Sequence, residues 1–287
     1  MKKKILTGLI AAGVLVASLG LAGCGGSDDS GSGSGDSGSA ASGSVVIAGS
    51  TSVQPLSEAM SEVYMEENPD VTVEVQGGGS GQGIKSIEDG IADIGSLSRE
   101  VGEDEKGSIS EEYVIAKDGV AVIVNADVNV DDLSLEQIKG IYTGEITNWS
   151  EVGGDDAEIT VVSREEGSGT RGAFTEITGV TVDDVDNTTK DALVQPSTGA
   201  VKETVSTTPN SIGYVSLGSL DDSVKVLTVE GVEATSENVV SGDYKIQRPF
   251  VYVVGSEVSE TAQAFIDFAM SDEGQKIVEE NDFIPVN

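Results

Sequence analysis

The stretch VVSREEGSGTRGAF, residues 161–174, decides the fold, and the rest of the chain can be interpreted from it. Val161 and Val162 are β-branched and apolar, which is typical of a buried strand. Gly167 and Gly169 allow the backbone to turn tightly and to approach another group closely. The stretch therefore predicts a strand, a loop of small residues and the start of a helix.

The loop in this stretch carries groups that suit an anion. Ser168 and Thr170 have hydroxyls that can cap the helix or donate to an anion, and the helix start presents unpaired N–H groups. Arg164, just before the loop, offers a planar fork of donors that matches a tetrahedral oxyanion. The alternative is a capped helix with Arg164 paired to a nearby Glu. This stretch alone leaves both interpretations open.

The same order of strand, Gly/Ser/Thr loop and helix occurs twice upstream. The three junctions lie in residues 45–65, 71–91 and 161–174, and the helix of the second is predicted to run through Ile91. Together they favour an anion cradle. No Lys-Ser/Thr follows at the Walker-A spacing, so nucleotide binding is not favoured. A fourth junction, at 197–201, is interpreted as a plain helix cap.

Charge and composition exclude several classes of function. The 287 residues include 50 acidic and 16 basic side chains, and the formal net charge of -34 argues against nucleic acid as the main partner. The chain has no His and one Cys, which excludes Ser-His-Asp catalysis, His-based zinc sites and an internal disulfide. No cofactor or metal is expected. An anion site must attract its ligand locally, because the overall field repels it.

Residues 1–24 are interpreted as a lipoprotein signal peptide rather than as part of the fold. Lys2–Lys4 precede an apolar run that ends in LAGC, which resembles the bacterial lipobox. The resemblance implies cleavage before Cys24 and its lipidation; the alternative is an N-terminal transmembrane anchor. Residues 25–43 are almost all Gly, Ser, Asp and Ala and predict a disordered tether. The remainder is expected outside the cytoplasmic membrane.

Alternating strands and helices predict an α/β fold with largely parallel sheets. In such sheets ligands bind beyond the carboxyl ends of the strands, where all three Gly/Ser/Thr loops are expected. Two apolar strands are predicted around Asp118 within residues 113–125. A buried carboxylate needs a partner, so Asp118 is either a structural hydrogen-bond anchor or the acceptor of a ligand proton. Trp149, the single Trp, is predicted in the core.

Four motifs together resemble the PstS family, the phosphate-binding proteins of the Pst-type ABC importer. They are GSTSVQP at 49–55, QGGGSG at 76–81, IYTGEITNW at 141–149 and SREEGSGTR at 163–171. The resemblance covers residues 45–287 and implies a two-lobed class II periplasmic-binding-protein fold, with two crossover strands as a hinge. Lobe one would comprise residues 44–117 plus 249–287, and lobe two residues 118–248.

The resemblance also implies which residues hold phosphate. The matched positions are Thr51, Ser52 and Ser80 in lobe one and Arg164, Ser168, Gly169 and Thr170 in lobe two. Some family members place an Asp after the strand that ends Ala-Asp-Ile-Gly, where it accepts the proton of monohydrogen phosphate. Here that place falls at Ser98, which joins the candidate set. Asp118 is the candidate replacement for the proton acceptor.

The expected function is the capture of inorganic phosphate by a monomer and its delivery to the membrane permease subunits of an ABC importer. A carboxylate that accepts the phosphate proton would reject sulfate, which has none. The same fold also allows another oxyanion (sulfate, molybdate or arsenate) or a surface lipoprotein that senses phosphate. An enzyme such as a phosphatase is disfavoured, because the sequence has no His and no evident paired-carboxylate metal signature.

Overall fold

The computed structural model describes residues 42–287. The predictions on the signal peptide, on Cys24 and on nearly all of the tether lie outside these residues. The first strand begins at Gly43, the last residue that the sequence assigned to the tether. Among the described residues, no helix combines the length and the apolar character needed to cross a membrane.

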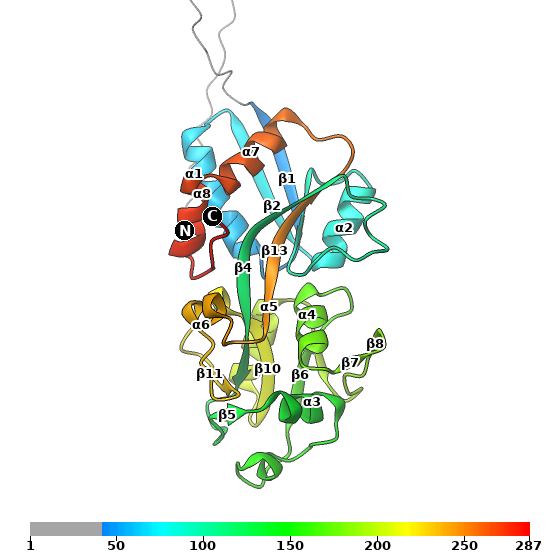
Figure 1. Cartoon of the computed structure of the whole chain (residues 1–287), viewed down its shortest axis with the longest axis vertical. Coiled ribbons are helices and arrows are strands. Elements are labelled where there is room, and N and C mark those ends of the chain that lie inside the picture. The colour runs from blue at the N-terminus through cyan, green and yellow to red at the C-terminus, as the bar shows by residue number, and fades with distance from the viewer. Residues whose placement is uncertain (1–41) are drawn as a thin grey trace, which may run out of the picture. The chain divides into compact units, whose positions relative to one another are not determined.

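The first lobe is built on three parallel strands. β1 (Gly43–Gly49) lies between β2 (Val71–Gly77) and β3 (Ile94–Leu97). The apolar side chains of β1, such as Val45 and Ile47, alternate toward a buried core. Helices cover both faces of this sheet (Figure 1): α1 (Gln54–Glu67), α7 (Glu260–Met270) and α8 (Asp272–Glu280) pack on one face and α2 (Ser80–Glu88) on the other.

Helix α2 is shorter than the sequence suggested. The helix ends at Glu88, and Gly90 has a φ of 65°, a left-handed conformation that favours glycine. Ile91 lies beyond the helix and is 61% exposed. The prediction of a helix through Ile91 is therefore wrong, because the backbone turns at Gly90 although the apolar spacing continues.

Two long strands run between the lobes (Figure 1). β4 (Glu111–Val124) and β13 (Gln247–Val254) pair antiparallel, with Arg248 opposite Asp118. The prediction of two strands around Asp118 is wrong, because one strand of 14 residues runs through this position. Gly119 does not break it, since this residue stays in the β4–β13 ladder. The two strands therefore connect the lobes directly.

The second lobe continues the sheet beyond β4. β10 (Ser211–Ser216) lies between β4 and β6 (Thr160–Arg164), and β9 (Leu193–Gln195) forms the edge. β6 is parallel to β9 and β10, whereas β10 is antiparallel to β4. The helices of this lobe are α3 (Leu135–Thr143), α4 (Gly169–Ile177), α5 (Thr198–Thr207) and α6 (Ser236–Ser241).

Short strands complete the second lobe: β5 (Asp132–Leu133), β7 (Thr181–Val182), β8 (Val185–Asp186), β11 (Lys225–Val226) and β12 (Thr228–Val229).

The prediction that Trp149 belongs to the core is confirmed. Its side chain is 2% exposed, and its Nε1 donates a hydrogen bond to the carbonyl of Asn210 at 3.0 Å.

The hydrophobic core has two main parts that follow the lobes. One is formed within residues 45–116 and 250–283, and the other within residues 120–246 together with Ile284. The crossing strands β4 and β13 stand in the middle of the strand order β2-β1-β3-β13-β4-β10-β6-β9. Ile284 packs with the core of residues 120–246, and the exact lobe boundaries stay a prediction.

Candidate functional site

Four helices start where the two lobes meet. In the first lobe α1 and α2 follow β1 and β2, and in the second lobe α4 and α5 follow β6 and β9. A helix start presents N–H groups that have no partner inside the helix. Neither α1 nor α2 has a capping side chain, so no cap residue accepts a hydrogen bond from the first N–H groups of these two helices.

Hydroxyl side chains gather at these helix starts and at the end of β3, and we call the following seven the hydroxyl cluster: Ser50, Thr51, Ser52, Ser80, Ser98, Thr170 and Thr198. All but Thr51 are 3% exposed or less. In the first lobe, Ser50 Oγ donates to Ser98 Oγ at 2.8 Å. The Ser98 N–H donates to Ser80 Oγ at 3.0 Å. Buried hydroxyls require such partners, and here they are mostly other hydroxyls.

Ser52 connects the two lobes. Its Oγ lies 2.8 Å from Thr170 Oγ1 and 2.9 Å from Thr198 Oγ1. The neighbouring Thr51 accepts a hydrogen bond through its Oγ1 from the Thr198 N–H at 3.2 Å. The loop before α1 thus contacts the first turns of both α4 and α5.

A second contact between the lobes depends on glycines. The Gly81 N–H donates to the carbonyl of Gly167 at 2.9 Å. A Cβ on Gly169 would lie 2.3 Å from Ser80 Oγ and 2.8 Å from Ser98 Oγ, closer than real Cβ contacts. Only glycine therefore fits here without displacing its neighbours. The three Gly/Ser/Thr loops that the sequence placed in one site do lie together.

Arg164 brings a buried positive charge to the cluster. It is 1% exposed, and its Nε and Nη2 donate to the two carboxylate oxygens of Glu165 at 2.8 and 2.7 Å. Its Nη1 donates to Thr198 Oγ1 at 3.1 Å. The two interpretations of Arg164 are therefore compatible, because it pairs with a Glu and also reaches the cluster.

Tyr214 holds the backbone of Arg164 in place. The Tyr214 hydroxyl accepts from the Arg164 N–H at 3.2 Å and lies 2.9 Å from Ser163 Oγ. Burial raises the pKa of Tyr214, so the hydroxyl stays protonated at neutral pH. The Arg171 Nη1 also donates to the Arg164 carbonyl, at 2.7 Å. The strand end that carries the guanidinium is thus fixed on both sides.

Ser168 has a separate use. Its hydroxyl accepts from the Arg171 N–H at 3.3 Å, which makes Ser168 the N-cap of α4. The residue is 5% exposed. The structure therefore shows a helix cap, and contact between Ser168 and a ligand stays a prediction.

Asp118 lies on the crossing strand β4, and its hydrogen-bond partners are not in the hydroxyl cluster. Its Oδ2 accepts from Arg248 Nε and Nη2 at 3.1 and 2.9 Å. Its Oδ1 accepts from Ser216 Oγ at 2.9 Å and from the Leu217 N–H at 3.2 Å. A carboxylate has about four acceptor positions, and the protein uses all of them. These contacts support the structural anchor, and we no longer consider Asp118 as the proton acceptor.

The interpretation of residues 197–201 as a plain helix cap is incomplete. Ser197 does cap α5, since its Oγ accepts from the Ala200 N–H at 3.1 Å. The next residue, Thr198, belongs to the hydroxyl cluster. The signal was present, because a strand followed by Ser-Thr-Gly repeats the order of the other junctions. Ser50 was also missed, although it stands beside Thr51 in the first loop.

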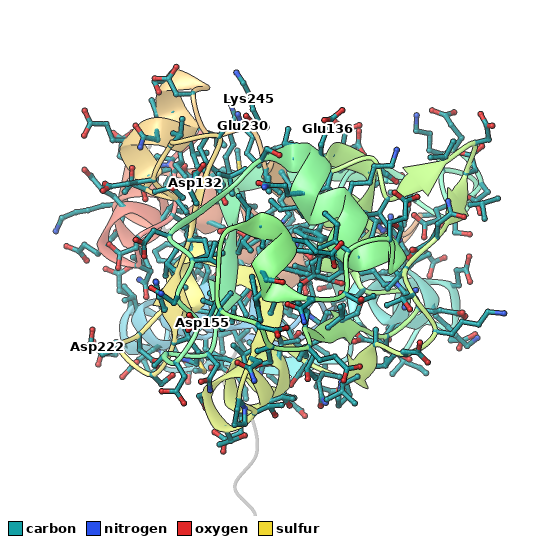
Figure 2. All side chains as sticks on the ribbon, turned by 90° about the horizontal axis from the view of Figure 1, so that it is seen from below. Asp132, Glu136, Asp155, Asp222, Glu230 and Lys245 are labelled. Carbon is teal, nitrogen blue, oxygen red and sulfur yellow. The ribbon has the colours of Figure 1, made fainter. Side chains whose placement is uncertain are left out.

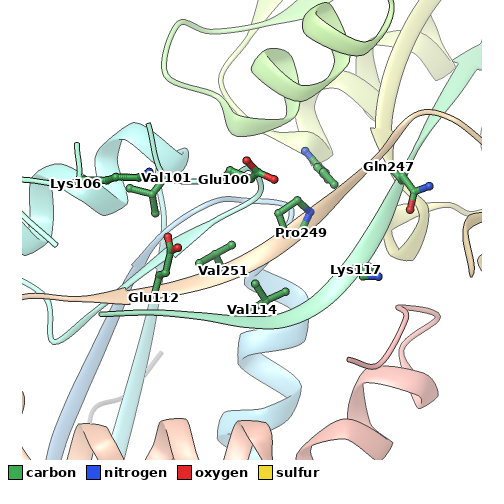
Figure 3. A pocket seen from close by; sticks show the side chains of 10 residues that line it. Glu100, Val101, Lys106, Glu112, Val114, Lys117, Gln247, Pro249 and Val251 are labelled. Atoms are coloured by element: carbon green, nitrogen blue, oxygen red, sulfur yellow. The ribbon is translucent and has the colours of Figure 1, made fainter. Parts of the chain in front are cut away.

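A groove of about 550 Å³ lies beside the crossing strands and has a different character (Figure 3). Glu100, Lys117 and Gln247 line it together with apolar side chains such as Val101 and Pro249. None of its lining residues belongs to the hydroxyl cluster. Its mixture of both charges with apolar groups does not suit a bare oxyanion, whereas the hydroxyls, helix starts and guanidinium of the cluster do.

The acidic side chains are found mainly on the surface. At the end of the second lobe, Asp132, Glu136, Asp155 and Glu230, labelled in Figure 2, are all exposed. Within residues 42–287, no three His, Cys, Asp or Glu side chains are grouped so as to hold a metal ion. Most of the acidic side chains thus lie away from the hydroxyl cluster, although the Glu165 carboxylate, paired with Arg164, lies beside it.

Comparison with known proteins places this geometry in a family. The PBP superfamily domain matches residues 34–273. The phosphate-binding protein PstS of Bacillus subtilis is 36% identical over 84% of this chain and 80% of its own length. A phosphate ABC transporter substrate-binding protein from Clostridium perfringens, solved with bound phosphate, is 46% identical, with a TM-score of 0.81 over 85% of this chain and 100% of that one.

An ABC-type phosphate transport receptor from Vibrio cholerae is 37% identical, with a TM-score of 0.70 over 84% of this chain and 99% of that one. These similarities confirm the α/β periplasmic-binding-protein fold that the sequence predicts. The chain belongs to the PstS family of phosphate-binding proteins.

Proposed function

We propose that the protein captures inorganic phosphate between its two lobes and delivers it to the permease subunits of an ABC importer. The observation that carries this proposal is the hydroxyl cluster. Ser52 from the first lobe meets Thr170 and Thr198 from the second at 2.8 and 2.9 Å, beside the buried Arg164. The Clostridium perfringens relative, whose structure contains bound phosphate, supports the choice of ligand.

The proposed ligand groups are donors from both lobes. They are Thr51, Ser52, Ser80 and Ser98 from lobe one, and Arg164, Ser168, Gly169 and Thr170 from lobe two. Hydrogen bonds to a charged group contribute about 1.5–3 kcal/mol each. Several of them, less the cost of removing water from the anion, are sufficient for micromolar affinity, about -8 kcal/mol.

Selectivity among oxyanions is expected to depend on hydroxyls. A hydroxyl can accept the phosphate proton as well as donate, so it does not reject sulfate as strictly as a carboxylate would. The carboxylate of Asp118 is committed to Arg248, Ser216 and Leu217. These contacts favour a second candidate function in the same site, the binding of phosphate together with a related oxyanion such as arsenate or sulfate.

Location at the outer face of the cell membrane is part of the proposal. The LAGC sequence ending at Cys24 supports a lipid anchor, and the Gly/Ser-rich residues 25–43 would tether the two-lobed unit to it. Replacement of Cys24 by Ser should abolish incorporation of labelled palmitate and release the protein into the medium. Continued labelling of the Cys24→Ser variant would contradict the anchor.

Calorimetric titration of the purified chain with phosphate, sulfate, arsenate and molybdate tests the function. We expect phosphate to bind at about micromolar affinity and more tightly than sulfate. A chain that binds none of the four anions would refute anion capture, and preference for molybdate would change the ligand. Hydrolysis of a model phosphate ester above background would revive the enzyme hypothesis.

A further inference from the structure

At the start of helix α5, the neighbouring residues Ser197 and Thr198 make different kinds of contact. Ser197 is the N-cap, because its Oγ accepts from the Ala200 N–H at 3.1 Å. Thr198, the first residue of the helix, is therefore not required for capping. Its side chain is nevertheless 2% exposed and directed away from solvent. The hydroxyl of Thr198 needs another explanation.

The contacts of Thr198 cross from one lobe to the other. Its Oγ1 lies 2.9 Å from Ser52 Oγ and 3.3 Å from Thr51 Oγ1, both in the first lobe. In its own lobe the same atom accepts from Arg164 Nη1 at 3.1 Å. Thr198 thus links the buried guanidinium to the first-lobe loop whose residues are proposed to hold phosphate.

The direction of these hydrogen bonds determines what Thr198 can do. Arg164 Nη1 can only donate, so Thr198 Oγ1 accepts from it and keeps its own hydrogen for another acceptor. A hydroxyl that accepts from a charged donor becomes a stronger donor itself. Its neighbours Ser52 and Thr51 belong to the proposed ligand set, and an oxyanion held by them would be within reach of the Thr198 hydrogen.

We infer that Thr198 is a further phosphate ligand, one that donates its hydroxyl hydrogen to the bound oxyanion. This inference rests on the proposed function. It adds the helix start of α5 to those of α1, α2 and α4, so that each lobe contributes two helix starts to the site. It also explains why Arg164 leaves Nη1 free of Glu165, since that nitrogen supports the Thr198 donor.

The test measures phosphate binding by calorimetry and thermal unfolding without ligand, in the full chain and its variants. Thr198→Val keeps the shape and removes the hydroxyl, and should raise the Kd about 10- to 100-fold. Thr198→Ser keeps the hydroxyl and should stay within about threefold of the original chain. Thr175→Val is the matched control, because Thr175 is equally buried but bonds only within the second lobe.

Unchanged affinity of Thr198→Val, or an equal loss in Thr175→Val, would overturn the inference. If Thr198→Val gives no cooperative unfolding transition, Thr198→Ala provides the same comparison without a branched side chain. Failure of the original chain to bind phosphate would instead refute the proposed function, so the two failures are distinguishable.

A combined variant distinguishes direct contact between Thr198 and the anion from an effect of Thr198 that acts only through Arg164. In an Arg164→Lys background the hydrogen bond to Thr198 is already altered. If Thr198 contacts the anion, Thr198→Val should still weaken phosphate binding there, by about tenfold. If it only positions Arg164, the second change should add less than about twofold, and that result would overturn the inference.

Discussion

The buried arginines Arg164 and Arg248 are 1% and 4% exposed, and the protein uses them differently. Arg248 pairs with Asp118, which is fully buried and whose remaining acceptor positions are filled by Ser216 and Leu217. Arg164 pairs with Glu165, whose side chain is 26% exposed, and its third nitrogen, Nη1, donates to the Thr198 hydroxyl. The carboxylate of Asp118 has all its acceptor positions filled, whereas the contacts of Arg164 are with a part-exposed carboxylate and a hydroxyl that an anion can replace.

The difference shows that burial alone does not identify a ligand-binding charge. Burial raises the pKa of Asp118 and lowers that of Arg248, and each partner opposes the shift of the other. Within the part of the chain that the structure describes, Arg248 Nη1 is the buried side-chain atom left without a partner. The Asp118–Arg248 pair is therefore expected to determine stability, and Arg164 to determine affinity.

The largest expected effect is on stability. Asp118→Asn leaves the buried guanidinium of Arg248 without its countercharge, which should lower the free energy of unfolding by about 3–5 kcal/mol. Phosphate affinity of the folded protein should change little. Denaturant unfolding and calorimetry measure the two quantities, and Asp131→Asn, at a 94% exposed side chain, is the control. Lost phosphate-over-sulfate preference at unchanged stability would return Asp118 to the ligand set.

The next effect is on binding. Arg164→Ala should weaken phosphate binding by about 2–5 kcal/mol, the range for removing one partner of a buried charged contact. Its unfolding free energy should fall less than that of Asp118→Asn, because Glu165 can turn toward water. Calorimetric titration and denaturant unfolding check both statements. Equal phosphate affinities of the original chain and the Arg164→Ala variant would mean that Arg164 does not bind the ligand. The proposed difference between Arg164 and Arg248 would then be wrong.

A third prediction concerns the meeting of the lobes. Gly169→Ala places a Cβ against Ser80 and Ser98, and an overpacked contact of this kind costs about 1–3 kcal/mol. We expect phosphate affinity to fall by this amount. The first lobe can relieve the overpacked contact by moving away from the second lobe, so the internal structure of each lobe need not be distorted. Gly199→Ala is the control, because a Cβ there meets nothing within 4 Å. Equal affinities of the two variants would mean that binding does not require this contact.

The smallest effect is expected at the partly buried pair of Arg99 and Glu105, whose side chains are 23% and 19% exposed. Burial raises the pKa of Glu105, but hydrogen bonds from Arg99 and the Gly102 N–H outweigh it and the pKa is lowered. Its contribution to stability is present above the unfolded-state pKa of about 4.3 and is lost as pH falls through the lowered value. Glu105→Gln should remove about 0.2–1 kcal/mol at pH 7 and less at pH 3.

Thermal unfolding at both pH values measures this term, with Glu103→Gln as the control at an 89% exposed side chain. A loss for Glu105→Gln as large as that for Asp118→Asn would contradict the ranking by burial.

The features that the sequence predicted correctly depend on residues close together in the chain. The strand, Gly/Ser/Thr loop and helix at residues 161–174 follow from local residue types, and the structure has them as β6 and α4. The features that the sequence did not predict depend on residues far apart in the chain. Asp118 and Arg248 are 130 positions apart, and Ser52 and Thr198 are 146 apart. No local sequence pattern predicts such pairs, because they form only when the fold brings distant elements together.

The continuity of β4 was missed for a related reason. Gly119 weakens a strand locally, but pairing with β13 on one side and β10 on the other more than compensates. The four motifs that resemble the PstS family supplied the candidate set that local patterns could not. The same resemblance omitted Thr198, whose position was visible in the sequence only as a helix start.

The exposed carboxylates labelled in Figure 2 affect the rate at which the anion reaches the protein. A chain with a formal charge of -34 surrounds itself with a negative potential that an approaching phosphate must cross. Dissolved salt screens that potential over a Debye length of about 8 Å at physiological ionic strength. Phosphate capture by this protein should therefore accelerate as ionic strength rises, the reverse of the salt dependence of an electrostatically guided encounter.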